Sequence, residues 1–272
     1  MDFEIHYTEE QQLFRAALRD WLEWHAPRNL NIPRDGRPLD PEAQEKLKEF
    51  RRKLGANGWL APSWPREYGG GGLGPPLETV LREELRRLAL PSVGDAPRWL
   101  SAMMVWGTPE QRLRYVPPAL RGETISWQMF NEPDAGTDLA SLRTQAVRDG
   151  SDWLITGEKS FITGRFDPDL LCTLAVTDPT RPPRLNLGIF MVDAHLPGIT
   201  IRTQALLMGS ERHVEMDNVR VPGNCLLGDP FAGWEIAQTI LEGERGGFDS
   251  RLVDDGGTIK SVLQYLREQG QV

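Results

Sequence analysis

The spacing of apolar residues predicts that the chain is helical as far as about Arg121. Phe14, Leu18, Trp21 and Leu22 recur at helical intervals and form one apolar stripe. Similar stripes predict further helices in the segments that begin near residues 41, 76, 96 and 109. This first part of the chain is therefore expected to be all-α.

Polar residues mark the starts of these helices. Thr8 followed by Gln11 has the form of a capping box, and the segment that begins at Thr108 repeats it. Asp40 followed by Pro41 has the form of an N-cap with proline at the first helical position. Each of these signals is local, so the helix starts can be predicted without knowing the fold.

The pattern changes between about Thr124 and Pro230, where short apolar runs alternate with turn residues. Asp149 and Gly150 separate two such runs, and this dipeptide is a strong hairpin signal. The other runs also have the length and composition of strands: TISWQMF, LLCTLAV, LGIFMV, ITIRTQALL and HVEMDNVRVP. We expect an antiparallel β domain here. Helical spacing returns after about Phe231, in GWEIAQTILEGERGGF and GTIKSVLQYLREQGQV.

Composition narrows the class of protein. The chain has 272 residues, of which 39% are hydrophobic and 26% charged, and its net charge is −8. The acidic balance argues against nucleic acid as the main partner. No apolar run reaches the roughly 18 residues of a membrane span, and the N-terminus has no signal-peptide pattern, so a cytoplasmic protein is expected. Cys172 and Cys225 lack CxxC spacing, which favours buried free thiols over a disulfide.

Neither the glycine-rich run nor the histidines indicate a binding site. The run GGGGLG from Gly69 to Gly74 satisfies G-x-G-x-x-G, but SWPREY precedes it where a dinucleotide site needs a strand. A glycine connector is the favoured interpretation. The histidines, including His25 and His213, have no partner at metal-ligand spacing in the sequence, so no metal is predicted.

The stretch WQMFNEPDAGTD, from Trp127 to Asp138, is the main candidate for a site. A strand-like run enters a polar turn with a glycine, which is one way to present backbone N–H groups to a ligand. It is also how an ordinary strand ends, and the pattern alone leaves both possibilities open.

The segment from Phe130 to Gly164 resembles the flavin-binding signature of the acyl-CoA dehydrogenase family. Members read roughly T/S-E-P-x-A-G-S-D, then a hairpin, then G-x-K-x-(W/F)-I-T. The matching positions are Glu132, Pro133, Ala135, Gly136, Asp138, Gly157, Lys159, Ile162 and Thr163. GWLAPSWPREYGG, DNVRVP and GER resemble further family blocks, so the resemblance covers essentially the whole chain.

The resemblance implies an α+β fold with an N-terminal all-α domain, a middle antiparallel β domain and the remnant of a C-terminal helical bundle. We expect these in residues 1–122, 123–230 and 231–272, the last truncated. It also implies FAD as cofactor, held by residues of the signature. The cofactor-binding residues it indicates are Gln128, Met129, Phe130, Asn131, Gly136, Thr137, Phe161, Ile162 and Thr163.

Individual roles follow from the resemblance. Phe161 stands where the family often has Trp, packed against the flavin ring, and Thr163 would hydrogen-bond near flavin N5. Thr137, at the family's serine position, would bridge toward the flavin phosphates and the bound CoA. Without the resemblance, Phe161 would be read as strand core and Thr163 as a strand end. Glu132 is expected to be structural, because an acidic group facing a reduced flavin would oppose the chemistry.

The catalytic base is harder to place. In most of the family it is a glutamate in a C-terminal region that this chain lacks, but a minority place it in an L-D-L-E-R-like stretch. LEGER aligns with that stretch, which puts Glu244 at the base position and Glu242 and Arg245 at substrate contacts. The alternative is that these glutamates are solvated helix charges and Arg245 a structural ion-pair partner.

Two functions are therefore expected to compete. One is oxidation of an acyl-CoA thioester to its α,β-enoyl form in lipid metabolism and fatty acid β-oxidation, with electrons passed to an electron-transfer flavoprotein. The other is a non-catalytic truncated chain or partner subunit of a heteromer. A homo- or hetero-oligomer is expected in either case. A related oxidase or a nucleic-acid-associated relative is a weaker alternative.

Overall fold

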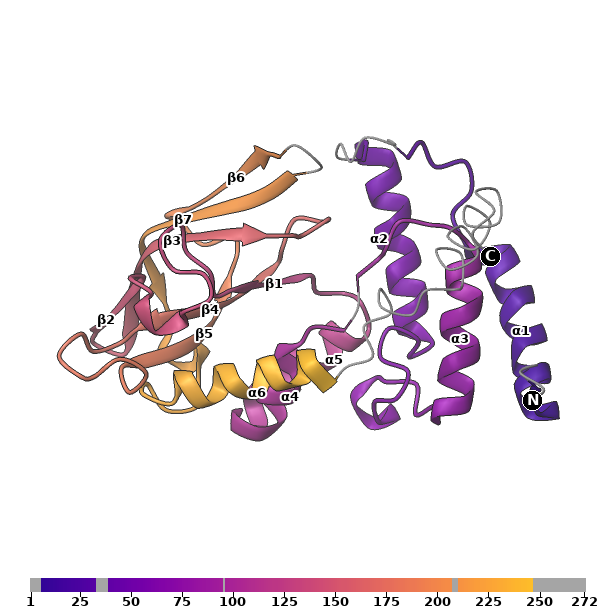
Figure 1. Cartoon of the computed structure of the whole chain (residues 1–272), viewed down its shortest axis with the longest axis horizontal. Coiled ribbons are helices and arrows are strands. Elements are labelled where there is room, and N and C mark those ends of the chain that lie inside the picture. The colour runs from indigo at the N-terminus through magenta and orange to yellow at the C-terminus, as the bar shows by residue number, and fades with distance from the viewer. Residues whose placement is uncertain (1–5, 33–38, 95, 207–209, 247–272) are drawn as a thin grey trace, which may run out of the picture.

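A computed structural model describes residues 6–32, 39–94, 96–206 and 210–246 of the chain. Figure 1 shows α1, α2 and α3 at one end of the molecule and a β-sheet at the other, with α4, α5 and α6 below the sheet. The expected α+β fold, helical first and mostly antiparallel β afterwards, is confirmed. In the described part of the chain, no helix combines the length and apolar character needed to cross a membrane.

The predicted helix starts are present in the structure. Thr8 and Thr108 both form complete capping boxes, and Asp40 caps its helix by accepting from the N–H of Ala43 at 2.7 Å. The described residues of this region form the α-helices α1 (Glu9–His25), α2 (Pro41–Ala56), α3 (Pro75–Arg87), α4 (Trp99–Trp106) and α5 (Pro109–Leu120).

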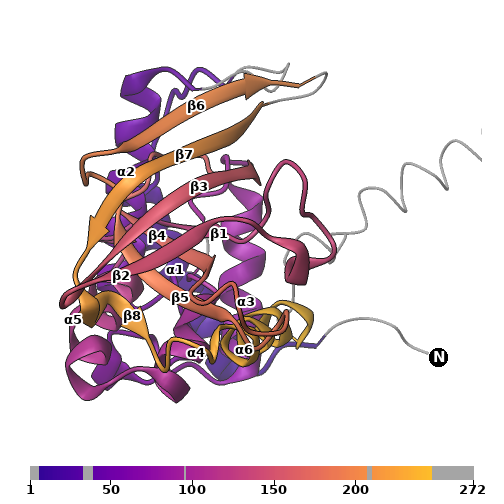
Figure 2. The same ribbon diagram turned by 90° about the vertical axis from the view of Figure 1, so that its left-hand side faces the viewer.

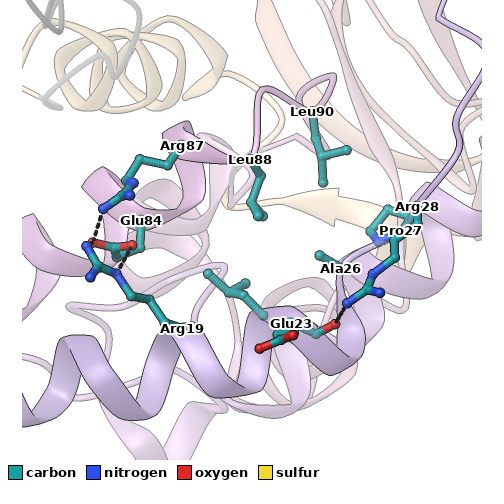
Figure 3. A pocket seen from close by; sticks show the side chains of 10 residues that line it. Arg19, Glu23, Ala26, Pro27, Arg28, Glu84, Arg87, Leu88 and Leu90 are labelled. Carbon is teal, nitrogen blue, oxygen red and sulfur yellow. Dashed lines mark hydrogen bonds and ion pairs between the residues drawn. The ribbon is translucent and has the colours of Figure 1, made fainter.

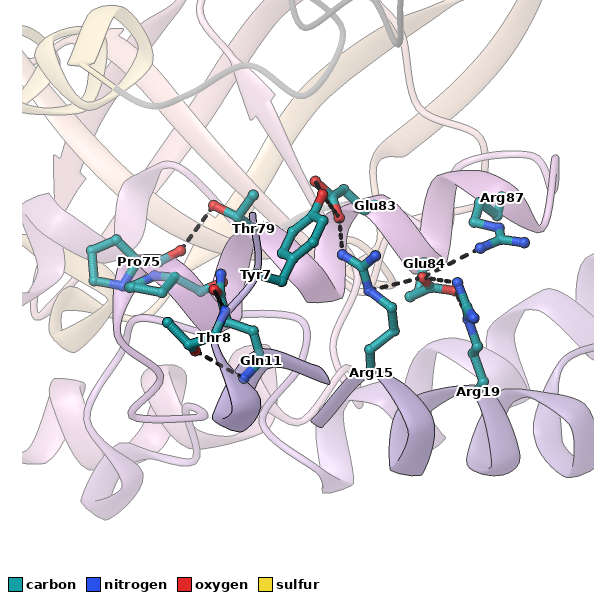
Figure 4. A network of polar contacts seen from close by, with 11 residues as sticks. Tyr7, Thr8, Gln11, Arg15, Arg19, Pro75, Thr79, Glu83, Glu84 and Arg87 are labelled. Carbon is teal, nitrogen blue, oxygen red and sulfur yellow. Dashed lines mark hydrogen bonds and ion pairs between the residues drawn. The ribbon is translucent and has the colours of Figure 1, made fainter. Parts of the chain in front are cut away.

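Polar groups join α1 to α3 along one side (Figure 4). The hydroxyl of Tyr7 donates to Glu83 at 2.9 Å, and Arg15 donates to the same carboxylate. Arg19 donates two hydrogen bonds to Glu84, at 2.8 and 2.9 Å. Burial acts to raise the pKa of Glu84, but the arginines outweigh it and hold that pKa below its usual range. Beside this network, apolar residues of α1, α2 and α3 form a small core.

The glycine run is a packed connector. A 3₁₀ helix, Arg66–Tyr68, precedes it where a dinucleotide site would need a strand. A Cβ placed on Gly58 would lie 2.5 Å from the carbonyl carbon of Gly70, and one on Gly70 would lie 2.3 Å from the carbonyl oxygen of Trp64. These glycines allow backbone segments to touch, which is a packing role.

The strands form one twisted sheet (Figure 2). Its order is β6-β7-β3-β2-β4-β5-β8, with β1 paired to β4. Most pairs are antiparallel, but β1 runs parallel to β4, as does the single β2–β4 pair. The strands are β1 (Ser126–Met129), β2 (Gln145–Asp149), β3 (Asp152–Ile162), β4 (Leu170–Val176), β5 (Leu187–Asp193), β6 (Ile199–Ala205), β7 (Ser210–Val221) and β8 (Leu226–Leu227).

The last described helix, α6 (Gly233–Gly246), packs on the sheet and on α4. Ile236, Ala237 and Ile240 are fully buried in the larger core, together with residues of α4, α5, β4 and β5. The helix therefore finds a core within this chain. The helix predicted in residues 257–272 lies outside the described residues. Both cysteines are free and buried, as expected; Cys172 lies in β4, and Cys225 lies in a 3₁₀ turn directly before β8.

Candidate functional site

A buried ion pair organises the loop that leaves β1. Lys159 Nζ lies 2.9 Å from Glu132 Oε1 and also donates to the carbonyl of Phe130 at 3.2 Å. Glu132 accepts from the backbone N–H of Arg143 at 2.6 Å and of Thr144 at 2.9 Å. We call residues 130–144 the candidate loop. Its two ends are thus fixed on one carboxylate, and the expected structural role of Glu132 has a physical basis.

The pair is balanced in charge. Burial lowers the pKa of Lys159 to about 8, although Glu132 acts against that shift. Burial acts to raise the pKa of Glu132, but Lys159 and the other donors outweigh it and hold the pKa below its usual range. The Glu132 carboxylate is neutralised by Lys159 and accepts hydrogen bonds from two backbone N–H groups. It therefore presents no uncompensated negative charge to the surface of the candidate loop.

The middle of the candidate loop is a tight turn with an accessible backbone. Glu132 and Ala135 exchange backbone hydrogen bonds of 2.8 and 3.2 Å. Asp138 then accepts from the N–H of Ala140 at 3.1 Å and caps a short 3₁₀ helix. Gly136 and Thr137 lie exposed between these anchors, and a Cβ on Gly136 would meet nothing within 4 Å. This glycine serves no internal packing contact.

A bulge in β3 projects an aromatic ring into solvent. The register with β7 shifts between Lys159 and Ile162, and Phe161 takes a φ of +58°. Phe161 is 53% exposed, so the alternative interpretation, in which it is strand core, is wrong. A bulky residue in left-handed backbone costs about 1–2 kcal/mol, and such strain is concentrated at functional sites. The next residues are Ile162, which is buried, and Thr163, which is exposed.

The end of β1 meets this bulge. The N–H of Ser160 donates to the carbonyl of Asn131 at 3.0 Å, which joins the candidate loop to β3. Gln128 and Asn131 are half-buried, whereas the side chains of Met129 and Phe130 point into the cores. Of the predicted cofactor residues, these two and Ile162 can offer a ligand only backbone groups.

Glycine is required where β1 approaches the segment after β3. Trp127 Nε1 donates to the carbonyl of Phe166 at 3.1 Å. A Cβ on Gly164 would lie 2.1 Å from the same indole nitrogen. Gly164 therefore lets the segment after β3 pack directly against the indole ring of Trp127.

No pattern in the sequence indicated Ser160 as a site residue. Its hydroxyl is buried beside Phe161 and has no hydrogen-bond partner within the described ranges. A buried hydroxyl without a hydrogen-bond partner lowers the stability of the fold by about 1–3 kcal/mol. The position next to the bulge therefore holds a polar group that no other protein group in the described ranges satisfies. Together with the exposed ring of Phe161 and the accessible backbone of the candidate loop, this fits a planar ligand that carries hydrogen-bonding groups, such as a flavin.

The predicted catalytic and substrate residues lie at the end of α6. Glu242 is exposed, whereas the side chains of Glu244 and Arg245 lie outside the described residues. The buried face of α6 shares one core with Phe130 and Ala135. The helix and the candidate loop are therefore packed on the same side of the sheet.

A hollow of about 390 Å³ lies between α1 and α3, apart from the candidate loop (Figure 3). Leu22, Leu88 and Leu90 give it an apolar lining, with Arg19 and Arg87 at the edge. Its buried carboxylate is already paired in the α1–α3 network. None of the residues that line it was indicated by the signature.

Comparisons with known proteins identify the two halves of the chain. The profile described as "Acyl-CoA dehydrogenase, N-terminal domain" matches residues 8–123, and "Acyl-CoA dehydrogenase, middle domain" matches residues 128–219. Acyl-CoA dehydrogenase FadE34 of Mycobacterium tuberculosis (strain ATCC 25618 / H37Rv) is 39% identical over 73% of this chain and 29% of its own length. Acyl-CoA dehydrogenase FadE29 of the same strain is 31% identical over 89% of this chain.

The chain spans 29% and 62% of the lengths of these two relatives. Among solved structures, "Tcur3481-Tcur3483 steroid ACAD" superimposes with a TM-score of 0.74 at 29% identity, over 99% of this chain and 70% of that one. The "ChsE4-ChsE5 complex from Mycobacterium tuberculosis" gives 0.73 at 26% identity, over 98% and 67%.

Proposed function

The chain belongs to the acyl-CoA dehydrogenase family, and from that premise we propose that it takes part in the FAD-dependent α,β-dehydrogenation of an acyl-CoA thioester. The observation that supports this most strongly is the strained and exposed Phe161 beside the end of β1. An aromatic ring that is held in solvent at an energetic cost suggests a ligand that packs against it. In this family the corresponding ligand is the flavin ring of FAD.

The proposed FAD contacts divide by the kind of group they offer. Gln128, Asn131 and Thr163 offer side chains, and Phe161 offers its ring. The buried residues Met129, Phe130 and Ile162 contribute backbone N–H and C=O groups. Gly136 and Thr137 offer the exposed turn of the candidate loop to the phosphates and to CoA. FAD, when bound, would accept the hydride that leaves the β-carbon of the thioester.

The electrostatics of the candidate loop suit a site that gains negative charge. Glu132 is neutralised by Lys159 and by two backbone donors, so its carboxylate does not oppose a negatively charged ligand. The exposed Thr163 and the half-buried Gln128 and Asn131 bring polar side chains to the ends of β1 and β3 instead. Such donors stabilise charge at little reorganisation cost, which is how a protein favours the reduced form of its acceptor.

We assign the proton step to Glu244, with Glu242 and Arg245 as substrate contacts. The carboxylate would take the α-proton while the β-hydride leaves, so that a C=C bond forms and two electrons pass on to an electron-transfer flavoprotein. This assignment rests on the match of LEGER to the family's alternative base position. The experiment below tests it separately from FAD binding.

A second function is favoured by the names of the similar structures. "Tcur3481-Tcur3483" and "ChsE4-ChsE5" each name two chains, and the first is called a steroid ACAD. On this alternative the chain is one subunit of a heteromeric acyl-CoA dehydrogenase, and the base comes from a partner. A bulky, steroid-derived thioester is the substrate class that this alternative favours.

An anaerobic titration separates the two functions. The purified chain, loaded with FAD, is mixed with straight-chain and steroid-derived acyl-CoA thioesters while the visible flavin band is recorded. Bleaching that is lost in Glu244→Gln but kept in Glu235→Gln, which changes an exposed glutamate of the same helix, supports the first function. A bound flavin that no thioester bleaches supports the partner-subunit alternative. Failure to bind FAD contradicts the first function.

A further inference from the structure

One histidine and two glutamates meet on the exposed face of β3 and β7. Glu158 of β3 is the register partner of Glu215 in β7, and His213 lies two residues earlier on the same face. His213 Nε2 is 3.5 Å from Glu158 Oε2 and 4.0 Å from Glu215 Oε1. Val214 and Met216 point the other way, into the core. Strand pairing creates this cluster, so no spacing in the sequence reveals it.

The cluster carries an electrostatic conflict. Like charges directly opposite each other on neighbouring strands are destabilising, and Glu158 and Glu215 form such a pair. Arg202 of β6 relieves one side, because its guanidinium lies 2.9 Å from Glu215. Within the described ranges, no Lys or Arg forms an ion pair with Glu158, and its basic neighbour on β7 is His213, 3.5 Å away. A cation between the three groups would remove the repulsion.

The distances suit a small divalent cation. Zinc binds imidazole nitrogen and carboxylate oxygen at about 2.0–2.2 Å, which places the ligand atoms of a tetrahedral site roughly 3.4 Å apart. The three ligand atoms here all lie within 4.8 Å of one another, and no other group of His, Cys, Asp or Glu in the described ranges does so. The side chains are 56%, 21% and 32% exposed, so small rotations can close the remaining gap.

We propose that Glu158, His213 and Glu215 form a surface binding site for a divalent transition-metal cation of the zinc class. One imidazole and two carboxylates form a donor set that such cations accept, with the remaining positions open to water. The site lies on β3 just before the Phe161 bulge but does not depend on FAD. A test of this metal site is therefore independent of a test of the proposed function.

Zinc binding to the metal-stripped chain tests the proposal. We expect one Zn²⁺ per chain by calorimetry, and His213→Ala to weaken binding by about tenfold or more. The matched control is His195→Ala, because His195 is also exposed and its ring Nε2 lies 3.9 Å from the carboxylate of Asp169, without belonging to a cluster of three ligands among the described residues. That control should bind as the wild type does. Glu158→Gln provides a second loss-of-ligand variant if His213→Ala fails to fold.

Substitution of Arg202 should strengthen Zn²⁺ binding, whereas substitution of a ligand should weaken it. The positive charge of Arg202 competes with a cation for Glu215, so Arg202→Gln should bind Zn²⁺ several-fold more tightly. Thermal unfolding gives a second measurement: at the same concentration, Zn²⁺ should raise the melting temperature of the wild type more than that of His213→Ala. No Zn²⁺ binding by the wild type, or binding by His213→Ala and Glu158→Gln as tight as that of the wild type, would overturn the proposal.

Discussion

Lys159 Nζ lies 2.9 Å from Glu132 Oε1, and this buried pair holds the end of β1 and the start of β2 against β3. Lys159 is completely buried, and the carboxylate also receives two backbone N–H groups from the far end of the candidate loop. The geometry of the proposed flavin edge therefore depends on two side chains that do not need to touch a ligand.

Removing one member of the pair should destabilise the protein strongly. Lys159→Met leaves the Glu132 carboxylate buried without its cation, and such changes cost about 3–5 kcal/mol. The double variant Glu132→Gln with Lys159→Met leaves no uncompensated charge and should recover part of that loss. Urea unfolding of the three proteins checks this. A single variant as stable as the wild type would show that the pair does not organise the loop.

The α1–α3 network should make stability depend on pH in the acidic range. The folded-state pKa of Glu84 is held below its usual value of 4.5, so its contribution is complete above that pH. The contribution is lost as pH falls through the lower folded-state value. The stability difference between wild type and Glu84→Gln should be constant from pH 7 to about 5 and shrink below. A difference that does not change with pH contradicts the account.

Of two glycines that flank the proposed flavin edge, only Gly164 should lose stability on substitution by alanine. Gly164→Ala places a methyl 2.1 Å from Trp127 Nε1, which must break the hydrogen bond to Phe166. We expect a loss of about 2 kcal/mol or more and a shifted tryptophan fluorescence. Gly136→Ala is the control, because nothing lies within 4 Å of its new Cβ. Equal effects of the two changes would contradict the described packing.

The strain at Phe161 predicts a trade between stability and binding. Phe161→Gly removes the left-handed penalty, so the unfolding free energy without FAD should stay unchanged or rise by up to about 1 kcal/mol. FAD affinity should fall, because the ring is lost, whereas Phe161→Trp should retain it. Thermal melts without FAD and FAD titrations measure the two effects. A loss of about 3–5 kcal/mol, typical of a core Phe, would show that the ring is packed.

Local signals in the sequence predicted much of the fold. The capping boxes at Thr8 and Thr108 and the hairpin at Asp149–Gly150 depend only on neighbouring residues, and the structure has all of them. The signature also indicated the segment in which the strained Phe161 lies.

Features that depend on distant pairing could not be predicted in this way. The parallel β1–β4 pair, the register shift beside Phe161 and the meeting of Glu158 with His213 all arise from strand pairing. Residues far apart in the chain are brought together there, and no short window contains the information. The orphaned hydroxyl of Ser160 likewise becomes visible only when its neighbours are in place.

Equilibrium titration of the flavin-free chain with FAD, followed by flavin fluorescence, tests the central claim most directly. We predict saturable binding of one FAD per chain, weakened by about tenfold or more in Phe161→Ala and measurably in Thr163→Ala. The exposed and distant Leu13→Ala should leave it unchanged. Absence of saturable binding, or equal affinity in the wild type and Phe161→Ala, would contradict a flavin site at the ends of β1 and β3.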